Sequence, residues 1–276
     1  FGLMDLYDTD GSSAGIGSWG LMGNSWGFDG MGQYPPHPSA WSKIQLGWVE
    51  PEIISVSGTY TIPAAQSTPF VYRIDRDYPA GEYLLIENRQ PIGFDQRIPQ
   101  GGLAIWQIDE TKGSLQQNNV NNDEGHPLQP GWPQNLRHYR VALLQADGLY
   151  HLERNLNQGD AEDMYHAEGN NTLTYQTTPA MISYQGPIIY PVRNDIIDIS
   201  ESGNEMTFTV AMPDIEPPTP NPPQWDIEPT ATGLHHIVMR AVEAKDDRFG
   251  VEYFFDCIED DTFDSGWQTS RLYQVG

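Results

Sequence analysis

The sequence has little basic charge, a single cysteine and no long apolar run, and each shortage excludes a class of protein. Fourteen Lys and Arg stand against 38 Asp and Glu, which gives the 276-residue chain a formal charge of −24. A surface of that sign repels nucleic acid and anionic membranes, so we expect neither as a partner. Cys257 has no second cysteine with which to form a disulfide in the chain. Since no apolar run reaches about 18 residues, we also expect no membrane span.

Proline marks a boundary between two folded parts. Residues 213–225 read PDIEPPTPNPPQW, with six prolines and no apolar periodicity. Such a composition is typical of a stiff, extended linker. We therefore expect a linker over residues 214–225, a β-rich domain over residues 53–213 and a second module over residues 226–276.

Short alternating segments predict a mainly β chain with a minority of helix. Alternation of apolar and polar residues favours strands in ISVSGTYTIP, EYLLIENRQ, GGLAIWQIDE and VEYFFDCIE, and the pair IIDIS and EMTFTVAM favours a hairpin. One helix is expected in HPSAWSKIQLGWV. Ser39 is its candidate N-cap, and Trp41, Ile44 and Trp48 would share one face.

The first residues match the end of a zinc motif. In many zinc peptidases two histidines one helical turn apart bind the metal, a glutamate activates water, and a third ligand follows a sharp turn. Glycine suits that turn because it adopts positive φ without penalty. Gly2 precedes Asp5 by three residues, as in the tail of H-E-x-x-H-x-x-G-x-x-D, whose histidines and glutamate would lie ahead of Phe1. Asp5 is then the third zinc ligand; alternatively, it is an ordinary turn carboxylate.

A second motif follows at SWGLMG, which places Met22 in a glycine-flanked turn. Metzincin peptidases carry such a Met turn beneath the zinc ligands, although a methionine is also a common core filler. The ordered segments are DLYDTDGSSAGIGSWGLMG, HPSAWSKIQLGW, EYLLIENRQ, GGLAIWQIDE, LLQADG and GDAED. Over roughly residues 1–213 this series resembles the immune inhibitor A-like family of secreted zinc metallopeptidases.

The resemblance implies a fold, a cofactor and a location. Residues 1–52 would be the C-terminal part of a metzincin-like catalytic domain, with zinc on Asp5 and a Met turn at Met22. The protein would be a secreted or cell-surface zinc-dependent endopeptidase acting on a protein or peptide substrate. Its general base glutamate is expected upstream of Phe1, so the 276 residues alone are predicted to be inactive.

After the linker, FDSGWQTSRLYQVG resembles the front half of a fibronectin type III-like domain. We expect an incomplete Ig- or fibronectin-like β-sandwich over residues 226–276, whose open strand edges could accept a strand from a partner. Such modules usually bind or space other domains. This leaves open an alternative function: a non-catalytic extracellular structural or adhesion protein built on a pseudopeptidase scaffold.

Two acidic segments are candidate calcium sites. Asp8 and Asp10 lie in DTDG, and Asp160 and Asp163 lie in GDAED. Carboxylates this close repel one another, so either solvent or a hard cation must offset their charge. The loop histidines show no i, i+4 pair and predict no metal site; they are His126, His138, His151 and His166.

Overall fold

The computed structural model describes residues 2–185, 190–212, 218–246, 251–258 and 260–275. The chain divides into two compact units, Phe1–Met212 and Pro213–Gly276. Strands outnumber helices in both units, so the prediction of a mainly β chain with little helix is confirmed. The metzincin-like and fibronectin-like assignments stay predictions.

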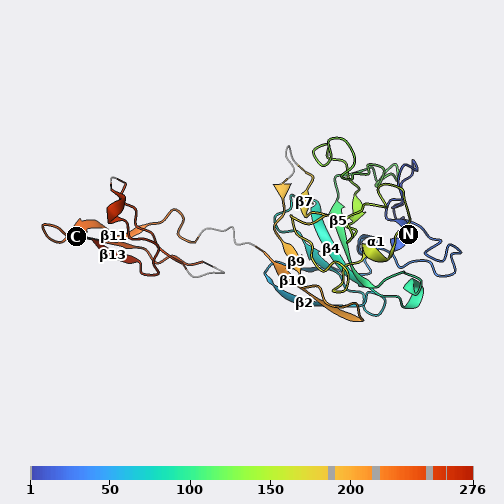
Figure 1. Cartoon of the computed structure of the whole chain (residues 1–276), viewed down its shortest axis with the longest axis horizontal. Helices are drawn as coiled ribbons and strands as arrows, with labels where there is room; N and C mark the ends of the chain where they lie inside the picture. Colours follow the sequence, from blue (N-terminus) through green and yellow to red (C-terminus); the bar gives the residue numbers. More distant parts are fainter. Residues whose placement is uncertain (1, 186–189, 213–217, 247–250, 259, 276) are drawn as a thin grey trace. The chain divides into compact units, whose positions relative to one another are not determined.

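A five-stranded sheet forms the centre of the first unit (Figure 1). Its strands, in spatial order, are β1 (Glu52–Ile53), β3 (Tyr72–Ile74), β4 (Glu82–Arg89), β5 (Gly102–Asp109) and β6 (Val141–Leu143). Strand β1 runs parallel to β3, and the other neighbours are antiparallel. Every residue of β4 and β5 is buried, as expected for central strands covered on both faces.

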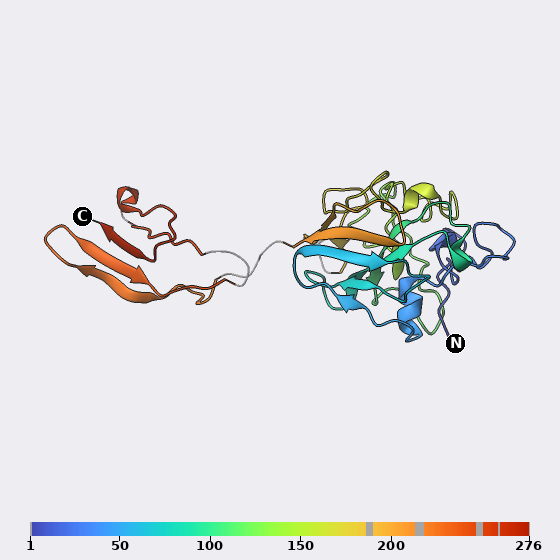
Figure 2. The same ribbon diagram turned by 90° about the horizontal axis from the view of Figure 1, so that it is seen from below.

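A second sheet packs beside the first. It consists of β2 (Gly58–Pro63), β10 (Glu205–Ala211) and β9 (Asp195–Ile197), all antiparallel, and Figure 2 shows β2 and β10 side by side. Strands β9 and β10 pair Thr209 with Ile197, which confirms the predicted hairpin. A short pair, β7 (Ile182–Ser183) and β8 (Tyr190–Pro191), completes the strands of this unit among the described residues.

The two faces of the five-stranded sheet bury two separate cores. In β4, Leu84 points into one core together with Phe208 of the second sheet. Its neighbour Leu85 points into the other core, which contains Trp19 and Trp41. This alternation follows from the two-residue period of a strand. The opening segment, residues 2–24, therefore covers the face of the sheet opposite to the second sheet.

The predicted helix is present as α1 (Ala40–Gln45). Ser39 caps it, because its hydroxyl accepts a hydrogen bond from the Ser42 amide at 3.3 Å. Trp41 is buried, but the expectation that Trp48 shares its face was wrong. The helix ends before Gly47, which has positive φ, and Trp48 is 54% exposed. The described residues also form four short 3₁₀ turns: η1 (Gly17–Trp19), η2 (Gly93–Asp95), η3 (Ala161–Asp163) and η4 (Asp261–Phe263).

A buried ionic network connects α1 to the central sheet. Lys43 of α1 pairs with Glu87 of β4, whose other oxygen accepts from Arg89 at 3.3 Å and from the Trp106 indole at 3.0 Å. Arg89 also pairs with Asp95 at 2.7 Å. Burial opposes ionisation of Glu87, but the charges of Lys43 and Arg89 outweigh it and lower its pKa. Two cations thus balance two anions inside the first unit.

The second unit contains an antiparallel sheet of β11 (Trp225–Ala231), β12 (Ile237–Ala241) and β13 (Leu272–Val275). Trp225 stacks on Phe255, and Phe255 stacks on Tyr273, with ring centroids 5.9 and 5.7 Å apart. Of the strand predicted over VEYFFDCIE, the described residues 251–258 form one isolated bridge, between Tyr253 and Gln268. Phe255 is nevertheless buried between exposed neighbours, so the alternation is present without a partner strand to extend it.

The predicted linker is described only in part. Residues 213–217 lie outside the described residues, whereas Thr219 pairs with Lys245 and Trp225 already begins β11. The later part of the proline-rich segment therefore belongs to the second unit. None of the described helices has the length and apolar character needed to cross a membrane, as the sequence predicted.

Candidate metal centres

Asp5, the predicted zinc ligand, is held by an asparagine far along the chain. The Asp5 amide donates to Asn118 Oδ1 at 2.7 Å, and Asn118 Nδ2 donates back to Asp5 Oδ2 at 2.5 Å. The Tyr7 hydroxyl adds a third hydrogen bond, also to Oδ2, at 3.0 Å. Within the described residues the carboxylate is thus fixed through one oxygen, which leaves Oδ1 for another partner.

The paired hydrogen bonds between Asp5 and Asn118, called the Asn118 clamp below, are one of three similar contacts. The segment NNVNN, residues 118–122, runs beside the opening segment and bonds to it through amide side chains. Asn121 Nδ2 donates to the Leu6 carbonyl at 3.1 Å. Asn122 Oδ1 accepts from the amide and hydroxyl of Thr9 at 3.1 and 2.9 Å. Side-chain amides thus take the place of a backbone ladder along this part of the opening segment.

Met22 lies in the tight turn that its glycine neighbours predicted. The Gly23 amide donates to the Gly20 carbonyl at 2.8 Å, and the Met22 side chain packs against the core that contains Trp19. The Met22 carbonyl accepts from the Leu6 amide at 2.8 Å. The turn is therefore attached to the residue directly after Asp5. Gly2 has a φ of +72°, in the region that favours glycine.

The Asp8 carboxylate accepts hydrogen bonds from residues that follow it directly, in and just after the DTDG segment. Its Oδ2 accepts from the Ser12 hydroxyl and from both the amide and the hydroxyl of Ser13, while Oδ1 accepts from the Asp10 amide. Burial opposes ionisation, but the hydrogen bonds from Ser13 and Ser12 outweigh it and lower the pKa of Asp8. Asp10 in turn accepts from the Ser12 amide. These contacts define a loop built by its own donors, and calcium at Asp8 and Asp10 stays a prediction.

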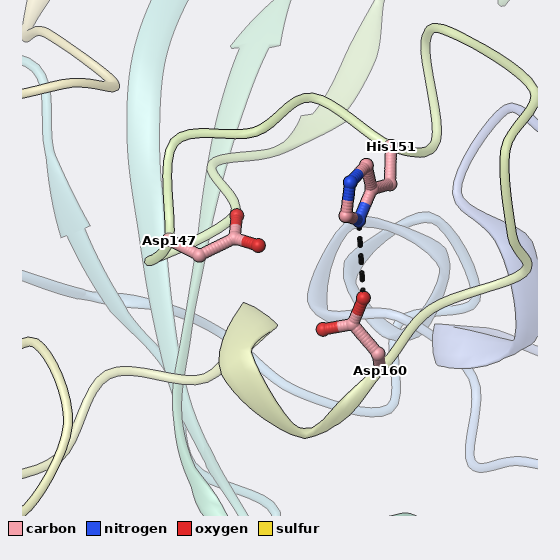
Figure 3. A group of neighbouring side chains, drawn as sticks. All are labelled: Asp147, His151 and Asp160. Carbon is pink, nitrogen blue, oxygen red and sulfur yellow. Dashed lines mark hydrogen bonds and ion pairs between the residues drawn. The ribbon is translucent and has the colours of Figure 1, made fainter.

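The acidic loop, residues 147–163, brings three ligand-type side chains together (Figure 3). Asp147 follows the β6 region, His151 lies in the next turn, and Asp160 is the N-cap of η3. Each offers an atom that lies within 4.8 Å of the other two, and His151 Nδ1 is 3.2 Å from Asp160 Oδ2. Among the described residues no other group of His, Cys, Asp and Glu meets in this way.

Two buried acids lie next to this group. Burial, with the charges of Asp160 and Asp147 adding to it, raises the pKa of Asp163 to about 7. Burial likewise raises the pKa of Glu153 to about 8, and Asp163 and Asp147 again add to it. In the described part of the chain, the ion pair of Asp160 is with His151, and no Lys or Arg pairs with these acids. The acidic loop therefore concentrates negative charge, and its one arginine, Arg154, donates to the Leu149 carbonyl at 3.2 Å.

The acidic loop packs directly on the opening segment. The Ala14 amide donates to the Leu152 carbonyl at 2.9 Å, and the Ser18 amide donates to the Gln158 carbonyl at 2.7 Å. The Trp19 indole donates to Asp163 Oδ2 at 2.6 Å. A ligand or contact that orders the acidic loop would therefore also stabilise the opening segment, which carries Asp5 and Met22.

His138 has a structural environment instead of a ligand-type one. One ring nitrogen lies 2.9 Å from the Leu136 carbonyl and the other 2.7 Å from Asp109 Oδ2, while the ring stacks on Tyr184 at 4.0 Å. Both nitrogens are thus engaged. Burial opposes the ionisation of Asp109, but the hydrogen bond from His138 helps to lower the pKa of Asp109 to about 2.

The sequence predicted Asp5, Met22 and Asp160 as site residues but not the residues that contact them. Asn118, Asp147 and His151 were not predicted as site residues. The run of asparagines at 118–122 and the spacing Asp147-x-x-x-His151 were the signals available.

Comparison of this chain with family models, curated proteins and solved structures finds no match. The resemblance to immune inhibitor A-like peptidases accordingly stays a prediction that depends on the order and content of its motifs.

Proposed function

We propose that this chain is part of a secreted or cell-surface zinc-dependent endopeptidase that hydrolyses peptide bonds in protein or peptide substrates. The observation that carries the proposal is the attachment of the Gly20–Gly23 turn to the segment of Asp5, through the hydrogen bond from Leu6 to Met22. A ligand carboxylate next to a methionine turn is the arrangement expected from the sequence motifs.

The residues present fit one corner of a zinc site. Asp5 Oδ1 is the atom that would bind the metal, and Asn118 and Tyr7 would hold the carboxylate through Oδ2. Zinc in such a site polarises the scissile carbonyl and activates a bound water molecule. Met22 would contribute packing only. The resemblance assigns the two histidines and the general base glutamate to chain ahead of Phe1.

Digestion of casein by the gene product that includes this upstream segment tests the proposal. We expect zinc-dependent cleavage that Asp5→Asn lowers by more than about 100-fold, because a ligand is lost. Asp198→Asn, at an exposed site in the same unit, is the matched control and should leave cleavage unchanged. Full activity of Asp5→Asn would contradict the proposal. Absence of zinc-dependent cleavage in every form would favour the non-catalytic structural or adhesion alternative.

A further inference from the structure

We propose that Asp147, His151 and Asp160 form a second metal site, which binds Zn²⁺ in the acidic loop. The proposal concerns a different part of the chain from Asp5 and does not depend on the proposed peptidase activity. It rests on the geometry of the three side chains, on a buried unpartnered carboxylate oxygen beside them, and on the chemistry of the donor set.

The geometry is close to that of a zinc polyhedron. Zinc–nitrogen and zinc–oxygen bonds of about 2.0–2.2 Å place neighbouring tetrahedral ligands roughly 3.3–3.6 Å apart. His151 Nδ1 and Asp160 Oδ2 are 3.2 Å apart. Asp147 lies within 4.8 Å of both, and its carboxylate is turned toward them in Figure 3. Asn157 Nδ2 donates to Asp160 Oδ2 at 2.6 Å and lies 3.3 Å from His151 Nδ1. The Asn157 amide would therefore turn aside, and the Asp147 side chain would move inward, for all three ligand atoms to reach one ion.

A second observation comes from Asp163, which is completely buried. Its Oδ2 accepts from the Asp160 amide and the Trp19 indole, whereas its Oδ1 has no hydrogen-bond partner among the residues that the structure describes. A buried carboxylate oxygen without a donor is costly unless a positive charge lies near it. Asp163 is within electrostatic range of both Asp147 and Asp160, so a cation between those two would also offset its charge.

The donor set selects the metal. Calcium takes hard oxygen ligands, whereas imidazole suits zinc and other transition metals. His151 supplies a nitrogen next to two carboxylates, and three protein ligands with a further position for water are a common zinc arrangement. The site shares Asp160 with the calcium hypothesis drawn from the sequence, whereas Asp163 is not one of the three ligands, and its Oδ2 already accepts from the Trp19 indole and the Asp160 amide.

Zinc in this position would have a structural consequence. It would join the β6 end of the acidic loop, at Asp147, to η3, at Asp160. The opening segment packs on this loop through Ala14, Ser18 and Trp19. Binding would therefore stabilise the opening segment as well as the loop, and the melting temperature of the first unit should rise with added Zn²⁺.

Isothermal titration calorimetry of Zn²⁺ into the metal-free 276-residue chain tests the site. We expect binding that His151→Gln and Asp147→Asn each weaken by more than about 100-fold, since each removes a ligand. His126→Gln is the matched histidine control, and Asp5→Asn controls for the zinc site of the proposed peptidase. Both should bind as the unchanged chain does. Far-ultraviolet circular dichroism and the urea midpoint show whether each variant is folded.

Four results would overturn the proposal. The first is Zn²⁺ binding that is unaffected by both His151→Gln and Asp147→Asn in folded protein. The second is absence of Zn²⁺ binding in the unchanged chain. The third is binding of Ca²⁺ without Zn²⁺, unaffected by His151→Gln, which would identify an oxygen-only site. Loss of Zn²⁺ binding in Asp5→Asn alone would assign the metal to the opening segment and would overturn the second site while leaving the proposed function intact.

Discussion

Replacing Glu87 by glutamine should destabilise the first unit strongly, although the two side chains have the same shape. Glu87 is completely buried, and its carboxylate accepts hydrogen bonds from Lys43, Arg89 and the Trp106 indole. With Asp95 it balances the charges of Lys43 and Arg89, so the neutral side chain leaves one uncompensated positive charge in the interior. Breaking a buried pair in this way costs about 3–5 kcal/mol in the free energy of unfolding.

Charge balance predicts that a double variant recovers part of this loss. Lys43→Met combined with Glu87→Gln restores neutrality and leaves Arg89 with Asp95 at 2.7 Å. The double variant should therefore lose at least about 2 kcal/mol less than the sum of the two single variants. As a control, Asp123→Asn weakens the ion pairs that the half-exposed Asp123 makes with Arg137 and Lys112, and it should cost less than about 1 kcal/mol.

Urea unfolding followed by tryptophan fluorescence measures these differences, because Trp19 and Trp106 are completely buried in the first unit. Coupling between Lys43 and Glu87 is the decisive quantity. If the cost of the double variant equals the sum of the single costs, charge balance is not what holds the network, and the reasoning is refuted.

Three further predictions concern single positions. The pKa of Asp109 is lowered to about 2 in the folded chain, so the ionised carboxylate contributes about 1–2 kcal/mol to the free energy of unfolding. This contribution is present above about pH 4 and is lost as the pH falls through about 2. Asp109→Asn should remove this pH dependence from the urea midpoints. Asn118→Ala breaks both hydrogen bonds of the Asn118 clamp and should lower the free energy of unfolding by roughly 1–3 kcal/mol in the same assay. An unchanged free energy of unfolding would show that these bonds do not hold the opening segment. Gly15→Ala would place a Cβ atom 2.1 Å from the Leu6 carbonyl oxygen, at a residue whose φ is +59°. Gly11 also has positive φ, but a Cβ there would meet open space, so Gly15→Ala should lower the melting temperature far more than Gly11→Ala. Equal shifts in melting temperature would argue against the close approach at Gly15.

Local signals were sufficient for several elements of the fold. Ser39 marks the start of α1 because a cap acts within a few residues of itself. Strands β9 and β10 were predictable because alternation and a short polar turn are both local. Trp48 was misplaced since a helical period says little about where a helix ends.

The candidate sites depend on contacts that no local pattern encodes. Asn118 meets Asp5 across 113 residues, and neither residue type nor spacing announces that pairing. Asp147, His151 and Asp160 lie closer in sequence, but they belong to irregular chain, where periodicity gives no guide to which side chains converge. The acidic character of the loop was predictable, and the approach of His151 to Asp147 and Asp160 was not.

The measurement that tests the central claim most directly is the sequence of about a dozen residues immediately ahead of Phe1, from coding DNA or peptide mass spectrometry. We predict that it reads His-Glu-x-x-His, with the second histidine six positions before Asp5. A segment in which a histidine or the glutamate is replaced would contradict a working zinc peptidase and would favour the structural or adhesion alternative.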